Sequence, residues 1–220
     1  VTFTAPTSAI TDASFSAAGI YTLRLSGSDG LLTRTDSVTV TVDAAGSIVR
    51  AIAASSDDAE EGPTAVNRTS SDLEMGIDGT VSQVVGLRFT NLTIPAGAVI
   101  TSAYVQFTCD EATTDPTQLT IAGQDSDDAA TFANTALNIS SRPLTTATVA
   151  WAPASWTTAN EAGPNQRTPN LASAVQEITS RPGWFSGNAI VFVITGTGTR
   201  IASAFDDGAA VAAQLIVTYQ

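Results

Sequence analysis

Short segments that alternate apolar and polar residues recur along this chain, and turn-forming residues separate them. The pattern is clearest in residues 20–26 and 36–42, with a Ser-Asp-Gly turn signal between them at residues 28–30. Because successive side chains of a strand point to opposite faces, this period of two indicates half-buried strands and predicts a β-hairpin. Antiparallel pairing is expected to gather six apolar side chains on one face: Tyr21, Leu23, Leu25, Val38, Val40 and Val42.

The remainder of the chain repeats this pattern in many short segments. A linker of small residues at 44–47 separates an N-terminal domain, residues 1–43, from a second domain at residues 48–220. Short strands separated by Gly, Pro, Asn and Asp predict an all-β fold, a jelly-roll-type β-sandwich. One helix is expected at residues 171–178, whose apolar members fall on one face, and Asn170 is its expected N-cap.

The charge of the chain excludes several classes of function. Nine arginines, no lysine and no histidine stand against 21 acidic residues, which gives a net charge of −12. Such a surface repels nucleic acid and anionic lipid, and no apolar run is long enough for membrane insertion. The absence of histidine removes the Ser/His/Asp and Cys/His mechanisms, and short loops offer no cleft for paired carboxylates. The sequence therefore predicts a protein that is not an enzyme.

The N-terminal residues resemble a known repeat. Residues 18–25 (Ala-Gly-Ile-Tyr-Thr-Leu-Arg-Leu), 28–30 and 38–42 are similar to the last two strands of a PKD-type immunoglobulin-like repeat. Immunoglobulin-like domains have about 100 residues, so the resemblance implies a partial immunoglobulin-like β-sandwich over 1–43. Either the chain begins within a domain or another chain completes the sheet, because unpaired strand edges bind further strands.

The second domain resembles another family. Residues 72–76, 85–89, 94–107, 149–151 and 213–219 are similar to the core of DNRLRE-like domains, and the resemblance covers nearly all of residues 47–220. Such domains are β-sandwich modules of secreted enzymes and surface proteins, and some are carbohydrate-binding modules. The resemblance thus implies an extracellular module. The abundance of Gly, Thr, Ser and Ala without lysine is typical of exported bacterial surface proteins.

Acidic residues cluster in segments that a sandwich could bring together at one end. Ca²⁺ binds six to eight oxygen ligands in flexible geometry, which suits carboxylates supplied by loops. The alternative is that these acids only keep loops solvated. The candidate calcium ligands are Asp57, Asp58, Glu60, Glu61, Asp72, Glu74, Asp206 and Asp207.

Aromatic side chains provide candidates for a sugar platform, since flat sugar faces stack on exposed rings. Trp156 lies among polar residues and is the better platform, whereas Trp151 continues an alternating strand and is expected to be buried. Polar neighbours would fix the orientation of the sugar. The candidate ligand-binding residues are Trp156, Trp151, Arg167 and Asn165.

Two functions follow from these observations. The first is polysaccharide recognition within a secreted multidomain enzyme or adhesin, with calcium as a stabilising ion. The alternative is a structural subunit of a surface filament or adhesive stalk, in which copies of the chain complete one another's N-terminal domain. The single cysteine, Cys109, lies in an alternating segment and is expected to be a small buried side chain.

Overall fold

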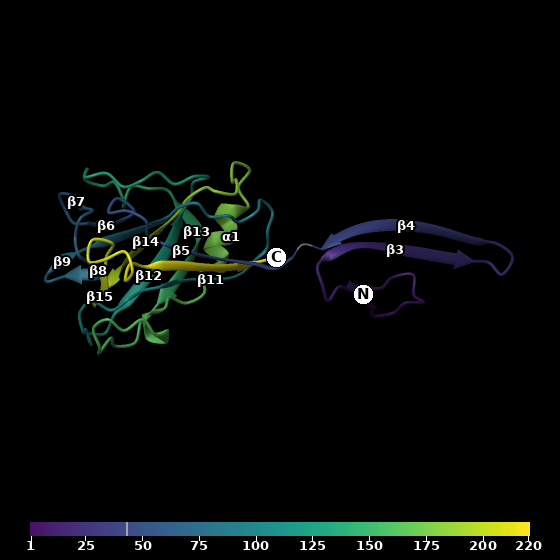
Figure 1. The fold of residues 1–220 in the computed structure, drawn as a ribbon, viewed down its shortest axis with the longest axis horizontal. Coiled ribbons are helices and arrows are strands. Elements are labelled where there is room, and N and C mark those ends of the chain that lie inside the picture. Colours follow the sequence, from purple (N-terminus) through teal and green to yellow (C-terminus); the bar gives the residue numbers. More distant parts are fainter. Residues whose placement is uncertain (43) are drawn as a thin grey trace. The chain divides into compact units, whose positions relative to one another are not determined.

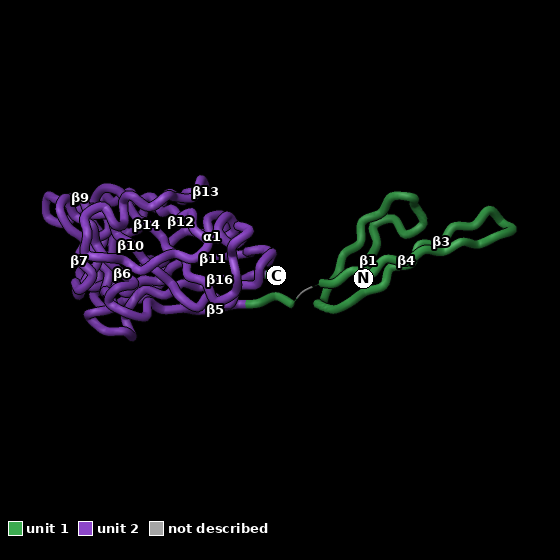
Figure 2. Tube along the Cα trace, turned by 90° about the horizontal axis from the view of Figure 1, so that it is seen from above, with its two compact units in different colours: residues 1–46, 220 green, residues 47–219 purple. Residues whose placement is uncertain are grey.

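The computed structural model describes residues 1–42 and 44–220, which divide into two compact units (Figures 1 and 2). Unit 1 comprises residues 1–46 with Gln220, and unit 2 comprises residues 47–219. The division falls within the predicted linker, although β5 already begins at Gly46. None of the helices in the described part of the chain is long and apolar enough to cross a membrane.

Unit 1 is built on the predicted hairpin. Tyr21 lies opposite Val40, and Leu23 lies opposite Val38, so the expected apolar face is confirmed. The turn is held by the Asp29 carboxylate, which accepts hydrogen bonds from the backbone N–H groups of Leu31 (2.9 Å) and Leu32 (2.8 Å). The strands of unit 1 are β1 (Thr2–Phe3), β2 (Ala13–Ser14), β3 (Gly19–Ser28) and β4 (Thr33–Val42).

Unit 2 contains three antiparallel sheets, in the orders β13-β12-β14-β10-β6-β7, β11-β16-β5 and β15-β8-β9. One short α-helix and one turn of 3-10 helix accompany them (Figure 1). The elements are β5 (Gly46–Ala51), β6 (Asp58–Glu61), β7 (Val66–Asn67), β8 (Asp72–Asp78), β9 (Val81–Ser82), β10 (Val84–Phe89), β11 (Ile100–Gln106), β12 (Gln118–Gln124), β13 (Leu144–Trp151), η1 (Pro164–Gln166), α1 (Ala172–Thr179), β14 (Ile190–Thr197), β15 (Thr199–Ser203) and β16 (Gln214–Tyr219).

The main core lies between sheets. Phe192 of the six-stranded sheet belongs to the same cluster of buried apolar side chains as Val105 of β11 and Leu215 of β16. The alternate residues of β14, Val191 and Val193, join a second cluster on the other face of that sheet. A strand covered on both faces becomes a continuous apolar run, which explains why β14 does not alternate. The protein is thus all-β, consistent with a β-sandwich with one short helix.

The helix follows the prediction with a shift of one residue. The α1 helix spans Ala172–Thr179, and its N-cap position is Leu171. The side chain of Asn170 still caps the first turn of the helix, because its Oδ1 accepts a hydrogen bond from the Ala172 N–H at 3.0 Å. Ala174, Val175 and Ile178 are buried, as the helical spacing predicts.

Candidate functional site

The predicted aromatic platform is part of the core. Trp156 is fully buried, so its assignment as an exposed sugar platform is wrong. Its backbone exchanges hydrogen bonds with Thr113 (2.8 and 2.9 Å), and its indole N–H donates to the Asn165 carbonyl at 2.9 Å. These bonds satisfy the polar atoms of the residue and let its ring pack beside Trp151 (6.4 Å between ring centroids) and Phe107 (6.3 Å). Trp151 is buried too, as its strand position predicts.

The two polar candidates near this region remain at the surface. Asn165 and Arg167 are both exposed. The guanidinium of Arg167 lies 4.2 Å from the centroid of the Tyr104 ring, and its Nε donates to Gln106 Oε1 at 3.2 Å. With both tryptophans in the core, the four predicted ligand residues do not form one exposed surface.

Four of the predicted calcium ligands lie in the buried strand β6 or directly before it. Asp57, Asp58, Glu60 and Glu61 are each at most 5% exposed, and the last three lie in β6 rather than in a loop. The β6 strand pairs with β10 and β7 inside the six-stranded sheet. In the part of the chain that the structure describes, no three His, Cys, Asp or Glu side chains lie close enough to hold a metal ion.

The acids of this strand are satisfied by protein donors. The Asp57 carboxylate accepts a hydrogen bond from Arg88 Nη1 at 2.7 Å, and the two side chains form an ion pair. Glu61 Oε2 accepts hydrogen bonds from the backbone N–H groups of Ile139 (2.6 Å) and Ser140 (3.0 Å). Buried carboxylates need such partners. These two side chains therefore hold neighbouring segments in place.

The structure places the acidic segment around Asp58 next to the acidic segment around Asp206. Asp58 Oδ2 accepts a hydrogen bond from the Phe205 N–H at 2.7 Å, and the Ser55 hydroxyl donates to Asp206 Oδ1 at 2.8 Å. Burial raises the pKa of Asp58 to about 7, with the charge of Asp206 adding to the effect. Asp58 thus retains a proton to an unusually high pH.

Two further predicted calcium ligands, Asp72 and Asp207, act through their charges on Asp110. Burial raises the pKa of Asp110, and the negative charges of Asp207 and Asp72 raise it further. The Asp72 carboxylate also accepts a hydrogen bond from the Ser70 hydroxyl at 2.8 Å. Asp207 is exposed, and among the described residues Asp72, Asp110 and Asp207 do not form a cluster that could hold a metal ion.

A polar hollow of about 390 Å³ lies beside β6 and β8. Glu60 lines it and accepts a hydrogen bond from the Glu74 N–H at 2.5 Å, while burial, together with the Glu74 carboxyl, raises the pKa of Glu60. The Oε1 atom of Gln83 is buried without a hydrogen-bond partner. The lining comprises Glu60, Gly62, Ala65, Val66, Asn67, Ser70, Glu74, Asp78 and Gln83.

The sequence pattern marks only part of this polar hollow. Asp72, Glu74 and Asp78 alternate with Leu73, Met75 and Ile77, so β8 carries a polar face that could have been read from the sequence. Asn67 of β7 and Gln83 between β9 and β10 also line the polar hollow, and no local sequence pattern predicts that they do.

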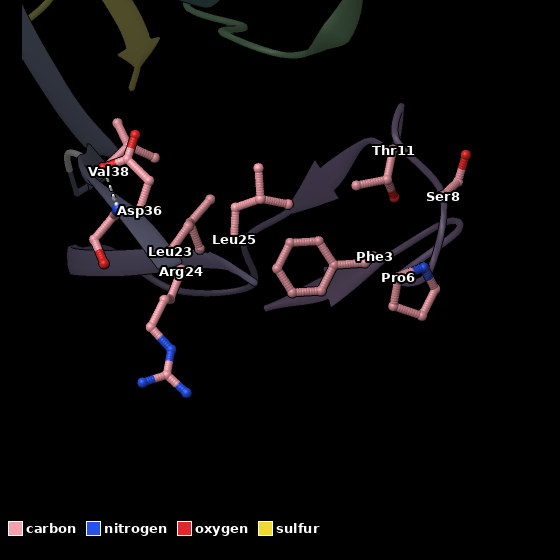
Figure 3. A pocket seen from close by; sticks show the side chains of 10 residues that line it. Phe3, Pro6, Ser8, Thr11, Leu23, Arg24, Leu25, Asp36 and Val38 are labelled. Atoms are coloured by element: carbon pink, nitrogen blue, oxygen red, sulfur yellow. Dashed lines mark hydrogen bonds between the residues drawn. The ribbon is translucent and has the colours of Figure 1, made fainter. Parts of the chain in front are cut away.

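An apolar hollow of about 400 Å³ lies on the hairpin of unit 1. Figure 3 shows Phe3 and Leu25 turned toward it, whereas the Arg24 guanidinium extends away from the apolar side chains. Leu25 is 71% exposed and Val38 is 57% exposed. The face that the alternation predicts is therefore present but only partly covered.

Comparison of the sequence with models of known protein families finds no match, and comparison with curated proteins finds none either.

Proposed function

We propose that this chain is a non-catalytic structural subunit of an extracellular bacterial filament or adhesive stalk, assembled through unit 1. The main support is that residues 1–42 include no buried residue, although the strands β3 and β4 place apolar side chains on one face. Eight of the 14 exposed large apolar side chains lie in unit 1, which is less than a quarter of the chain. A face of this kind is expected to be covered in the working state.

The size of the hairpin supports the same proposal. An isolated two-stranded hairpin is at best marginally stable in water, and three or more strands with an apolar face are needed for independent stability. β3 and β4 form a sheet of two strands, and β1 and β2 form a separate one. Additional strands from another chain would add backbone hydrogen bonds and cover apolar side chains at once. The resemblance of residues 1–43 to part of an immunoglobulin-like repeat is consistent with this requirement.

Light scattering over a range of concentrations tests the proposal, with electron microscopy of the largest species. The native chain is expected to form assemblies, and Leu25→Asp is expected to reduce their mass to that of one chain. Leu144→Asp is the matched control, because Leu144 is an exposed leucine of unit 2 at 44% exposure. A native chain that stays monomeric at every concentration would contradict the proposal.

Polysaccharide binding is a second candidate function, supported by the polar hollow. Its volume suits a sugar residue, and its carboxylates and amides could bond sugar hydroxyls. The unpartnered Gln83 Oε1 would gain a donor from such a hydroxyl. The resemblance to DNRLRE-like domains favours the same ligand class.

Affinity electrophoresis in polysaccharide gels tests the second candidate. Asn67→Ala is expected to reduce retardation of the chain, whereas Asn165→Ala, an exposed asparagine outside the polar hollow, should not. Equal migration of the native chain with and without every polysaccharide tested would remove this function.

Calcium binding is a separate proposal, motivated by the net charge of −12 and the many carboxylates of the chain. A divalent cation bound by these carboxylates would stabilise the folded chain by mass action. Millimolar Ca²⁺ is expected to raise the melting temperature relative to EDTA. Identical melting curves in the two solutions would exclude it.

A further inference from the structure

We infer that two copies of this chain pair through the outer edge of β3. The strands would run antiparallel about a two-fold axis at Leu23 and form a four-stranded sheet in the order β4-β3-β3-β4. This inference rests on the proposed function and names the partner and the register of its first contact. Because a two-fold pair closes on itself, growth into a filament would use a further contact.

The outer edge of β3 pairs with no other described strand, although Phe3 and Pro6 of the N-terminal segment line the same hollow as Leu23 and Leu25. Among the residues that the structure describes, β3 pairs with β4 alone. The backbone hydrogen bonds of the N-terminal segment, such as that from the Thr4 N–H to the Asp12 carbonyl at 3.0 Å, stay within that segment. Proteins protect free edges with proline, with several charges or with covering loops. The ten residues of β3 contain no proline and one charge, Arg24.

Self-pairing of β3 gives the side chains on both faces of the strand suitable neighbours. With Leu23 opposite Leu23 of the second copy, Tyr21 faces Leu25 on the apolar side, and Thr22 faces Arg24 on the polar side. The pairing extends from Gly19 to Gly27, and no like charges lie opposite each other. Aromatic and aliphatic residues directly opposite are favourable cross-strand neighbours.

Other registers and the other edge are less favourable. A shift of one residue would move the apolar side chains of one copy to the polar face of the other. A β3 register centred on Arg24 would place the two arginines directly opposite each other. Self-pairing of β4 along its length, centred on Val38, would place Arg34 opposite Val42 and Asp36 opposite Val40. When paired along most of its length, β3 is therefore self-complementary, whereas β4 is not.

The pairing also explains the composition of the exposed face. In the four-stranded sheet, the apolar side chains of both hairpins form one continuous surface, and the apolar hollow of each copy adjoins the other. Leu23 is half-buried in a single copy and would be covered at the axis by its own counterpart. A sheet of four strands reaches the size at which an apolar face can be stable.

Disulfide crosslinking of the full chain tests the register. Cys109 is buried and is the only native cysteine, so an introduced thiol reports on its own position. Leu23→Cys places two thiols opposite each other at the axis, within the range that a disulfide needs. Mild oxidation is expected to convert most of this variant to a covalent dimer that reductant reverses. Leu31→Cys, at a loop leucine that is 92% exposed, is the matched control and should crosslink at least tenfold less.

A mixture of two variants checks the register without altering the apolar face. Thr22→Cys mixed with Arg24→Cys should form a mixed disulfide, because these exposed positions face each other across the axis. The inference is overturned if Leu23→Cys and Leu31→Cys crosslink equally, or if the mixture forms no mixed disulfide. If the native chain assembles in light scattering while crosslinking fails, the register falls and the proposed function stands. A native chain that is monomeric throughout removes both.

Discussion

Replacing Asp58 with asparagine tests how the buried acidic strand is held. Asparagine keeps an oxygen that can accept the Phe205 N–H, now bonded to the Asp58 carboxyl at 2.7 Å, and it removes the titrating group. Burial raises the pKa of Asp58 to about 7 in the folded chain, whereas an unperturbed aspartate titrates near about 3.9. The folded chain therefore binds this proton more tightly than the unfolded chain.

The sign and size of the effect follow from linkage. The stability that Asp58 contributes is present in full below about pH 4 and is lost as the pH rises to about 7. At about 1.4 kcal/mol for each pKa unit, the loss is about 4 kcal/mol. Asp58→Asn does not titrate, so its free energy of unfolding should gain about 4 kcal/mol relative to the native chain between pH 4 and pH 8.

Urea denaturation followed by tryptophan fluorescence measures this difference. The three tryptophans, Trp151, Trp156 and Trp184, all lie in unit 2, so the signal reports the unit that contains Asp58. Asp78→Asn, at an exposed acid of β8, is the control for exchanging a carboxylate for an amide. If the free energies of unfolding of Asp58→Asn and the native chain change in parallel with pH, within about 1 kcal/mol, the explanation is refuted.

Three further substitutions test other parts of unit 2 by the same urea assay. The buried guanidinium of Arg200 donates to the carbonyl groups of Pro153 (3.0 Å), Ala154 (2.9 Å) and Asp115 (2.9 Å), so Arg200→Met should cost at least about 3 kcal/mol; a cost below about 1 kcal/mol would contradict this role. Gly76 has φ +104° and faces the Gly198 carbonyl, so Gly76→Ala should destabilise by more than about 1 kcal/mol, and an unchanged midpoint would count against it. Trp156→Ala should cost about 3–5 kcal/mol as a core residue, whereas an exposed platform would lose little.

The fold was predictable from the sequence because its signals are local. Alternation in residues 20–26 and 36–42 requires only the geometry of a strand, and the structure pairs Leu23 with Val38 accordingly. The spacing of Leu171, Ala174, Val175 and Ile178 likewise marks one helical face. The unbroken apolar run of β14 indicates a strand covered on both faces, but not which segments cover it.

The candidate site was less predictable because distant partners decide it. The polar neighbours of Trp156 suggest exposure, yet Thr113 and Asn165 accept its hydrogen bonds and allow burial. The acidic run Asp57–Glu61 suggests a solvated loop, yet donors at Phe205 and Ile139 allow its acids to lie in a buried strand. Each partner is supplied by tertiary structure, which short-range patterns do not contain.

The most direct test of assembly through unit 1 is hydrogen exchange of the β3 amides as a function of protein concentration. In an antiparallel hairpin, alternate N–H groups of β3 point away from β4. These outward amides should exchange rapidly in dilute protein and slow by at least tenfold at concentrations where the chain assembles, while the inward amides change less. Exchange of the outward amides that stays equally fast across the whole concentration range would contradict the account.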